Sequence, residues 1–114
     1  MDAATLNELK ERLISLKKEI TARMKENLEK VNTIKVKGDE GDFSSAMYSR
    51  QILYDLIERD RFHLQEIEES LFDIEKGTYG ICKRCGKEIE MERMKAKPTA
   101  KYCIACRKVV ESGK

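Results

Sequence analysis

The sequence has little of what builds a large globular core. Of its 114 residues only 6% are aromatic, one is proline and none is tryptophan, whereas 39% are charged. This composition suits long exposed helices better than an extensive core. The length allows one compact domain, or one small module with an extended part. The net charge of +2 is too small to indicate nucleic-acid binding by itself.

Two kinds of hydrophobic segment are also absent. No apolar run approaches the length that spans a membrane. No apolar stretch follows a basic N-terminus, as it does in an export signal. We therefore expect a cytoplasmic protein that does not associate with membranes.

Catalytic patterns are lacking as well. The single histidine, His63, falls in the middle of a helical stretch, where a surface position is a better expectation than a ligand. No Ser/His/Asp or Cys/His set suggests nucleophilic catalysis, and the EF-hand calcium pattern is absent. We predict that the protein is not an enzyme.

Four cysteines are present, and they form two C-x2-C pairs near the C-terminus with 17 residues between the pairs: Cys82, Cys85, Cys103 and Cys106. This spacing is typical of a tetrathiolate zinc site, and Gly86 follows the first pair, where a turn often needs a positive φ. Two disulfides or a redox pair would use the same residues. A reducing cytosol disfavours disulfides, and no βαβ context accompanies a redox motif. We expect one structural Zn²⁺, since four thiolates leave no open catalytic position.

A long helix is predicted for residues 4–36, which contain no glycine or proline. Its apolar residues recur mostly at coiled-coil spacing, with a local stutter between Ile20 and Leu28. The glycines of residues 37–42 predict a tight turn, and Asp42 is the expected N-cap of a second helix. The predicted seam consists of Leu6, Leu9, Leu13, Leu16, Ile20, Met24, Leu28, Val31 and Ile34.

The second helix is predicted from about residue 43 to 76, where Gly77 ends it. Its apolar stripe consists of Ala46, Leu53, Leu56, Ile57, Leu64, Ile67, Leu71 and Ile74. An antiparallel fold pairs Leu13 with Ile67. Asp60 then falls opposite Ile20, and we expect it to turn outward or to meet Lys17 or Arg23.

The predicted fold is therefore mainly α: a long antiparallel two-helix coiled-coil hairpin, a small C-terminal four-cysteine zinc finger and a short terminal helix. The predicted domains are residues 1–77, with an acidic tip at 38–42, and residues 78–114. An acidic tip is either simply solvated or suited to a cationic or metal-containing cavity.

Charge is distributed unevenly between these predicted domains. Residues 1–76 carry 13 basic and 17 acidic side chains, whereas residues 77–114 carry 10 basic and 4 acidic ones. The basic surplus either offsets the charge of about −2 on a zinc tetrathiolate or forms a phosphate-binding surface.

Three segments resemble the DksA/TraR C4-type zinc finger family: YGICKRCGKEI at 79–89, RMKAKPTA at 93–100 and CIAC at 103–106. The preceding hairpin resembles the coiled coil of that family. The resemblance implies a transcription regulator that binds bacterial RNA polymerase, inserts its coiled-coil tip into the secondary channel and does not bind specific DNA. It also implies tip residues, which are Asp39 and Asp42, with Ser44 in place of the family alanine.

The same resemblance implies a part in the stringent response through guanosine tetraphosphate, which some members hold against polymerase. Arg59, Lys97 and Arg107 fall at basic positions of that site. Glu66, however, stands where a lysine is expected, and His63 replaces an apolar residue. Because a carboxylate repels phosphates, we expect little response to this nucleotide.

Two other functions remain open on the residues alone. A DNA-binding zinc finger would present Arg107 and Lys108 on a helix after Cys103, although the acidic 1–76 segment would be repelled by phosphates. A coiled-coil adaptor or dimer would use apolar residues outside the seam, such as Ile14, Ile52 and Leu56. We expect a monomer.

Overall fold

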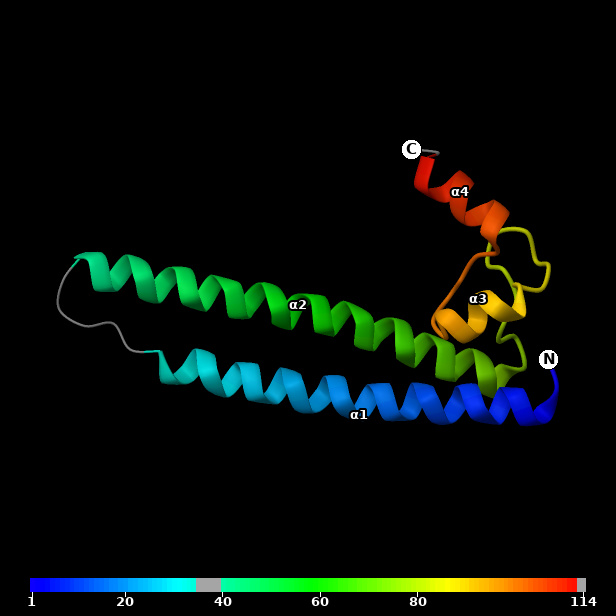
Figure 1. The fold of residues 1–114 in the computed structure, drawn as a ribbon, viewed down its shortest axis with the longest axis horizontal. Coiled ribbons are helices and arrows are strands. Elements are labelled where there is room, and N and C mark those ends of the chain that lie inside the picture. Colours follow the sequence, from blue (N-terminus) through cyan, green and yellow to red (C-terminus); the bar gives the residue numbers. More distant parts are fainter. Residues whose placement is uncertain (35–39, 113–114) are drawn as a thin grey trace. The chain divides into compact units, whose positions relative to one another are not determined.

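The computed structural model describes residues 1–34 and 40–112. It contains four helices within these residues, α1 (Ala3–Thr33), α2 (Glu40–Lys76), α3 (Met91–Ala96) and α4 (Ile104–Ser112), as drawn in Figure 1. The described part of the chain has no strand, only an isolated antiparallel bridge between Ile81 and Glu88. None of its helices is long and apolar enough to span a membrane.

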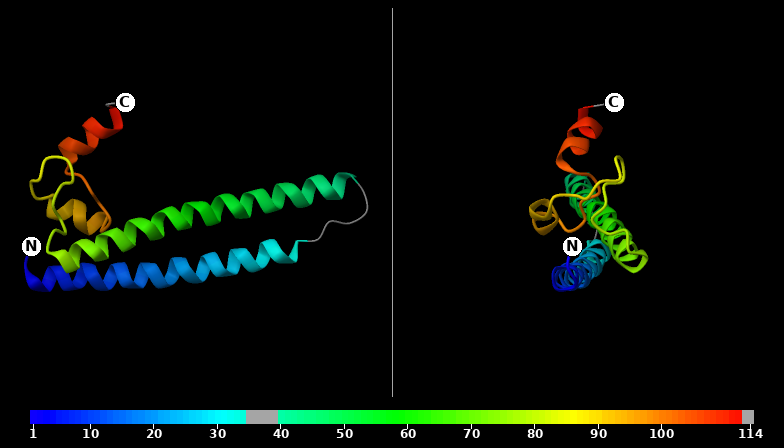
Figure 2. Two further views of the ribbon diagram at one scale, coloured as in Figure 1. Left: turned by 180° about the vertical axis from the view of Figure 1, so that it is seen from behind. Right: turned by 90° about the vertical axis from the view of Figure 1, so that its right-hand side faces the viewer.

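The chain divides into two compact units that both contain parts of α1 and α2. Unit 1 comprises Met1–Leu16 and Glu66–Lys114, and unit 2 comprises Lys17–Gln65. In each unit the two helical segments run side by side in opposite directions (Figures 1 and 2). The predicted mainly α hairpin is thus confirmed. The predicted domain boundary after residue 77 stays a prediction, because the borders of the two compact units fall after residues 16 and 65.

The start of α2 corrects one expectation about Asp42. The helix begins at Glu40, so Asp42 is its third residue and not its N-cap. A carboxylate in the first helical turn is favourable because the exposed N–H groups there carry partial positive charge. Gly41, which the sequence assigned to the turn, is therefore the second residue of this helix. Residues 37–39 of the turn predicted at 37–42 lie outside the described residues.

The seam of unit 1 is mostly apolar and largely agrees with the predicted stripes, although Ser70 is buried and its neighbour Leu71 is only half-buried. Leu9, Leu13 and Ile67 are almost fully buried. Leu9 also belongs to a cluster that includes three of the cysteines together with Ile89 and Met94. The first part of α1 and the cysteine-containing segment therefore share one hydrophobic cluster.

The seam of unit 2 contains polar residues, which corrects the predicted stripe. Ile20, Val31 and Ile57 are buried as expected, but Leu28 is 45% exposed and its neighbour Asn27 is buried instead. After Met24 the helix resumes three-residue and four-residue steps at 27 and 31, so position 28 turns away from the partner helix.

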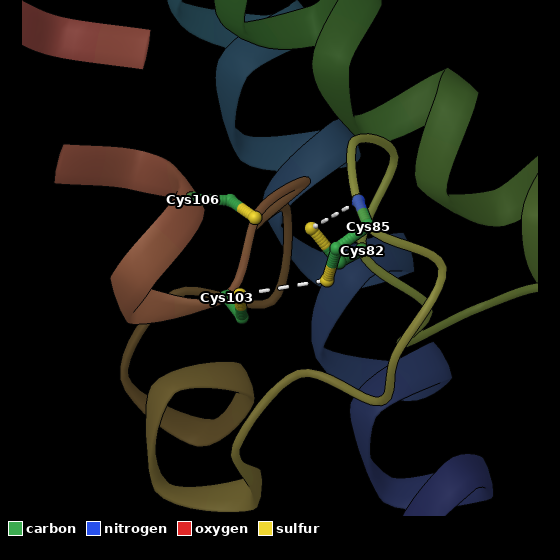
Figure 3. A group of neighbouring side chains, drawn as sticks. All are labelled: Cys82, Cys85, Cys103 and Cys106. Carbon is green, nitrogen blue, oxygen red and sulfur yellow. Dashed lines mark hydrogen bonds between the residues drawn. The ribbon is translucent and has the colours of Figure 1, made fainter. Parts of the chain in front are cut away.

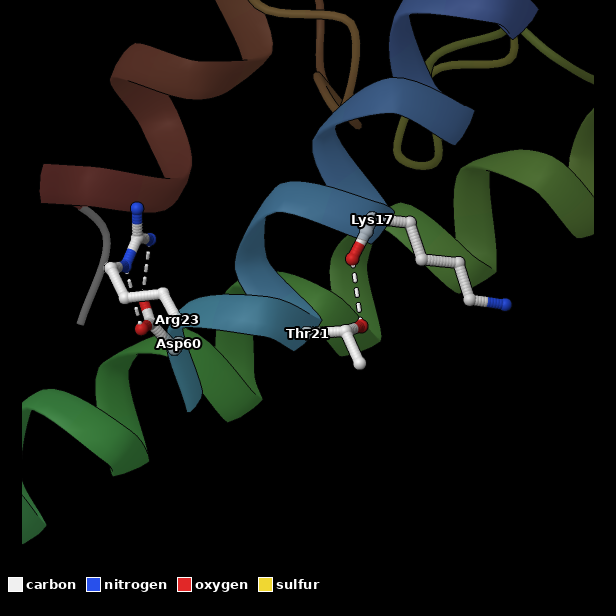
Figure 4. A network of polar contacts seen from close by, with 4 residues as sticks. All are labelled: Lys17, Thr21, Arg23 and Asp60. Atoms are coloured by element: carbon white, nitrogen blue, oxygen red, sulfur yellow. Dashed lines mark hydrogen bonds and ion pairs between the residues drawn. The ribbon is translucent and has the colours of Figure 1, made fainter. Parts of the chain in front are cut away.

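Asp60 is buried in this seam and does not turn outward. Its two carboxylate oxygens accept hydrogen bonds from Nη2 and Nε of Arg23 at 2.7 and 2.9 Å (Figure 4). The predicted contact of Asp60 with Arg23 is confirmed. Arg23 lies three residues after Ile20, the residue that was expected opposite Asp60. Nearer residue 34, Nη2 of Arg50 donates to the Ile34 carbonyl at 2.8 Å.

The C-terminus of α2 ends as the sequence predicts. Gly77 has φ of +78°. Its N–H donates to the Ile74 carbonyl at 3.3 Å, and the Thr78 N–H donates to the Asp73 carbonyl at 2.9 Å. This pair of bonds is the Schellman arrangement, which satisfies the last carbonyls of a helix. It turns the chain from α2 into the segment that contains the first cysteine pair.

Candidate metal centre

The four cysteine side chains converge from two segments of unit 1. Cys82 and Cys85 lie on the loop that precedes α3, whereas Cys103 precedes α4 and Cys106 lies in the first turn of α4, with the sulfurs gathered together (Figure 3). Their Sγ atoms all lie within 4.8 Å of one another. Cys85 is exposed and the other three are buried.

The first pair is held by a tight turn at Gly86. Gly86 has φ of +77°, as the sequence predicts, and its N–H donates to the Cys82 carbonyl at 3.0 Å. The Cys82 N–H donates in turn to the Lys87 carbonyl at 2.8 Å. The Cys85 N–H points at the Cys82 sulfur at 3.5 Å, so the backbone itself supplies a donor to a thiolate.

The second pair is held by the start of α4. The Arg107 N–H donates to the Cys103 carbonyl at 2.8 Å, and the Ile104 N–H donates to Oε1 of Glu90 at 3.2 Å. Helix N-termini favour negative charge because their N–H groups are unpaired. Cys106 lies in this first turn, so the helix terminus is one contribution that favours its thiolate.

These distances fit a tetrahedral metal site. A Zn–S bond of about 2.3 Å places tetrahedral sulfurs about 3.8 Å apart, and the Cys85 and Cys103 sulfurs are 3.9 Å apart. A disulfide requires about 2.05 Å between sulfurs. The four cysteines are free, so the alternative of two disulfides does not describe this structure.

The sulfurs differ in acidity. Burial disfavours the Cys82 thiolate, but hydrogen bonds from backbone N–H groups, led by that of Cys85, outweigh burial and lower the pKa of Cys82 to about 6. The hydrogen bond from Arg84 favours the Cys106 thiolate, but burial and bonds among the neighbouring thiols raise the pKa of Cys106 to about 11. Cys82 thus loses its proton near neutral pH. A bound dication would favour the thiolate form of all four cysteines.

Ion pairs join the cysteine segment to α2 within unit 1. Nζ of Lys83 lies 2.7 Å from Oδ2 of Asp73, and Nζ of Lys101 lies 2.6 Å from Oε2 of Glu69. The hydrogen bond that Lys101 donates to Glu69 raises the pKa of Lys101. The two pairs lie one helical turn apart on α2, so they orient this segment on one face of the helix.

Hydrogen bonds to backbone carbonyls support the same arrangement. Nη1 of Arg12 donates to the Lys95 carbonyl at 2.7 Å. The Tyr79 hydroxyl donates to the Pro98 carbonyl at 2.7 Å. Burial raises the pKa of Tyr79 to about 12, so this hydroxyl keeps the proton that it donates.

Two of the predicted nucleotide-contact residues meet at one cavity. Lys97 and Arg107 line a cavity of about 160 Å³ in unit 1 together with Glu66. Arg59 lies on an exposed part of α2 in unit 2. The remaining lining residues are Arg93, Thr99, Lys101, Tyr102, Val110 and Glu111.

The predicted tip residues lie partly within the described chain. Asp42 and Ser44 are exposed in the first two turns of α2. Asp39 lies outside the described residues. The exposed start of α2 therefore presents a carboxylate and a small hydroxyl side chain to solvent.

The site contains contacts that sequence reasoning missed. Glu90 caps α4, and α3 was not predicted as a helix. Nη1 of Arg84 lies 3.6 Å from the Cys106 sulfur. The sequence signal for this contact was the position of Arg84 between two predicted metal ligands, Cys82 and Cys85.

A closed set of four cysteine ligands, packed against the ends of two antiparallel helices, defines a C4 zinc finger on a helical hairpin. Residues 77–112 match the model of the prokaryotic dksA/traR C4-type zinc finger. The chain belongs to the DksA/TraR family, and its four cysteines fit one structural zinc ion.

Similar proteins extend the match beyond the zinc finger. An uncharacterised protein of Aquifex aeolicus is 36% identical over 97% of this chain and 79% of its own length. The RNA polymerase-binding transcription factor DksA of Escherichia coli is 39% identical over 47% of this chain, which is 36% of its own length. The structure of transcription factor DksA2 from Pseudomonas aeruginosa has a TM-score of 0.88 and 30% identity, covering 97% of this chain and 86% of that one.

Proposed function

We propose that this protein is a non-enzymatic transcription regulator that binds bacterial RNA polymerase directly. In this proposal the tip of the coiled coil enters the secondary channel and modulates initiation, without sequence-specific DNA binding. The observation that carries the proposal is the match of nearly the whole chain, hairpin and zinc finger together, to the fold of a DksA-type transcription factor. Binding to polymerase would place the protein in the cytoplasm, and we propose that it acts as a monomer.

The tip mechanism is supported by the chemistry of the start of α2. Asp42 is exposed on the first helical turn, and Ser44 follows it on the same helix. With Asp39, these residues form the proposed acidic end. A carboxylate that enters a narrow cationic or metal-containing channel interacts more strongly there than in water, because water is excluded.

The test compares charge removal at two places on α2. The chain is first assayed for capture of purified polymerase, and initiation is then measured in vitro with the wild type and Asp42→Asn. Asp55→Asn is the matched control, because Asp55 is an exposed carboxylate on the same helix that bonds to Gln51 one turn away. We expect Asp42→Asn alone to abolish the effect on initiation while capture persists. Absence of capture at micromolar concentration would refute the proposal.

The response to guanosine tetraphosphate is proposed to be weak. Lys97 and Arg107 would attract phosphates, but Glu66 lines the same cavity, and Arg107 is bonded to Glu111 at 2.8 Å. A phosphate entering this cavity would therefore meet carboxylates as well as cations. Glu66→Lys is expected to increase the nucleotide's effect on initiation, with Glu68→Lys, on the exposed side of α2, as the control. An equal gain from both variants would point to general charge.

Two outcomes would favour the other functions. A gel shift with sequence preference at low salt would support DNA binding by α4, where Arg107 and Lys108 lie. A dimer in light scattering would support an adaptor that uses the exposed apolar residues of α2, among them Ile52 and Leu56.

A further inference from the structure

The cations around the sulfur cluster are not equivalent. Three of them are held by carboxylates: Lys83 by Asp73, Lys101 by Glu69 and Arg107 by Glu111. Arg84 differs, because its Nη1 donates to the Cys106 sulfur at 3.6 Å. These three cations of the segment are thus paired with acids, whereas Arg84 is directed at a sulfur.

The guanidinium of Arg84 also interacts electrostatically with Cys82 and Cys85. Its hydrogen bond to Cys106 raises the pKa of Arg84, and the charges of Cys106, Cys82 and Cys85 act in the same direction. Arg84 lies between Cys82 and Cys85 in the sequence, so the turn that aims those two sulfurs at the metal also carries the guanidinium to the cluster. An arginine stays charged at every pH at which the protein is folded.

We infer that Arg84 is a positioning residue of the zinc centre: its guanidinium binds the Cys106 sulfur, offsets part of the centre's negative charge and slows loss of the metal. A tetrathiolate zinc site carries a net charge of about −2, and repulsion among its four sulfurs opposes metal retention. A cation in hydrogen-bonding contact reduces that repulsion. It also withdraws charge from the metal-bound Cys106 thiolate, which makes that sulfur a weaker nucleophile.

Contacts of this kind matter in metal sites because outer partners orient the ligands and tune their donor strength. Loss of such a partner typically changes metal affinity or activity by about 10–100-fold. Arg84 is exposed, so water and salt screen its charge. We therefore expect a smaller effect, of about two- to fivefold in the rate of zinc release.

The test uses the zinc-loaded full-length chain with excess 4-(2-pyridylazo)resorcinol, and zinc release is followed by absorbance. Arg84→Ala is compared with Lys87→Ala, which removes one exposed positive charge from the same loop and makes no ion pair within the described residues. We expect Arg84→Ala to release zinc about two- to fivefold faster than wild type and Lys87→Ala to match wild type. Raising the salt concentration should speed release from wild type more than from Arg84→Ala.

A second readout distinguishes a specific contact from a general loss of structure. N-ethylmaleimide adds to a thiolate by forming a C–S bond, and the adjacent carbon then takes a proton from water. In the zinc-loaded protein the metal keeps Cys106 deprotonated, so mass spectrometry of the modified sites should show faster labelling of Cys106 in Arg84→Ala, with labelling of the exposed Cys85 unchanged. Equal labelling of both sulfurs in wild type and variant would overturn the inference.

A conservative variant keeps the inference testable if Arg84→Ala loads zinc poorly. Arg84→Lys retains the charge, and its release rate should fall between those of wild type and Arg84→Ala. Circular dichroism at 222 nm and the zinc content of each purified protein establish that the variants are folded. Equal release from Arg84→Ala and Lys87→Ala, or from Arg84→Lys and Arg84→Ala, would contradict a specific role for the guanidinium.

Discussion

The pair formed by Arg23 and Asp60 determines how unit 2 tolerates a charge in its seam. Asp60 is 6% exposed, whereas the Arg23 side chain is 51% exposed. Arg23→Met would leave a buried carboxylate without its two donors. Breaking a fully buried pair costs about 3–5 kcal/mol, but the exposed side of Arg23 lets water approach. We therefore expect a loss of about 2 kcal/mol in the free energy of unfolding.

Replacing the carboxylate itself should have a different result. Asp60→Leu removes the charge that needs a partner and places an apolar side chain in the seam between Ile57 and Leu64. Replacement of ion pairs by hydrophobic residues is often neutral or stabilising, so we expect a change between zero and a gain of about 1 kcal/mol. In the double variant Arg23→Met/Asp60→Leu, the cost of Arg23→Met should largely disappear.

The free energy of unfolding should also depend on pH in a direction that follows from the pKa of Asp60. The hydrogen bond from Arg23 holds the pKa of Asp60 below its ordinary value. A lowered pKa contributes stability that is present above about pH 4, the ordinary range of aspartate, and is lost as the pH falls through the folded value. The difference in the free energy of unfolding between wild type and Arg23→Met should therefore stay constant from about pH 8 to 6. It should narrow below about pH 5, as the unpaired carboxylate of the variant takes up a proton.

Urea unfolding in buffered zinc, followed by circular dichroism at 222 nm, measures these differences. The m-values must agree between variants, so that the midpoints report stability. A cost below about 0.5 kcal/mol for Arg23→Met, or a cost of about 2 kcal/mol or more for Asp60→Leu, would refute the reasoning.

Three further predictions concern the seam, the helix end and the metal. Leu13→Ala should cost about 3 kcal/mol in urea unfolding because Leu13 is fully buried, whereas Leu28→Ala should change stability by less than about 0.5 kcal/mol. Gly77→Ala should cost about 1 kcal/mol by the same assay, because φ is +78° there. Removal of zinc by a chelator should reduce the helical signal at 222 nm by at most about a fifth, since α3 and α4 hold 6 and 9 residues against 31 and 37 in α1 and α2. A larger loss would mean that α1 and α2 also depend on the metal.

The metal site and the overall fold were predictable from the sequence because both depend on local spacing. Two residues between cysteines, followed by glycine, produce the same turn wherever the chain carries them, and Gly86 has the expected positive φ. The same holds for Gly77 at the end of α2. The contact of Arg84 with Cys106 was harder to foresee, because it joins two segments 22 residues apart and depends on how the turn points a flexible side chain.

Prediction of the seam succeeded or failed according to its chemistry. In unit 1, Leu9, Leu13 and Ile67 are buried as expected, but Ser70 is buried beside the half-buried Leu71. In unit 2 the choice lay between Leu28 and Asn27, and hydrophobicity favours leucine. An α-helix drifts by about 20° per heptad relative to a strict coiled-coil repeat. Which of two adjacent residues faces inward therefore depends on the winding of both helices.

A polar residue in such a seam lowers the stability of the helix pair, but it specifies the register in which the two helices pack. Asn27 and Asp60 are both buried in unit 2, and Asp60 is bonded to a partner on the opposite helix. A slip of α1 by one turn would separate Asp60 from Arg23 and leave the carboxylate buried without donors. An all-leucine seam would lose much less on slipping. The ion pair therefore favours one register of the hairpin, and with it one position of Asp42 relative to α1.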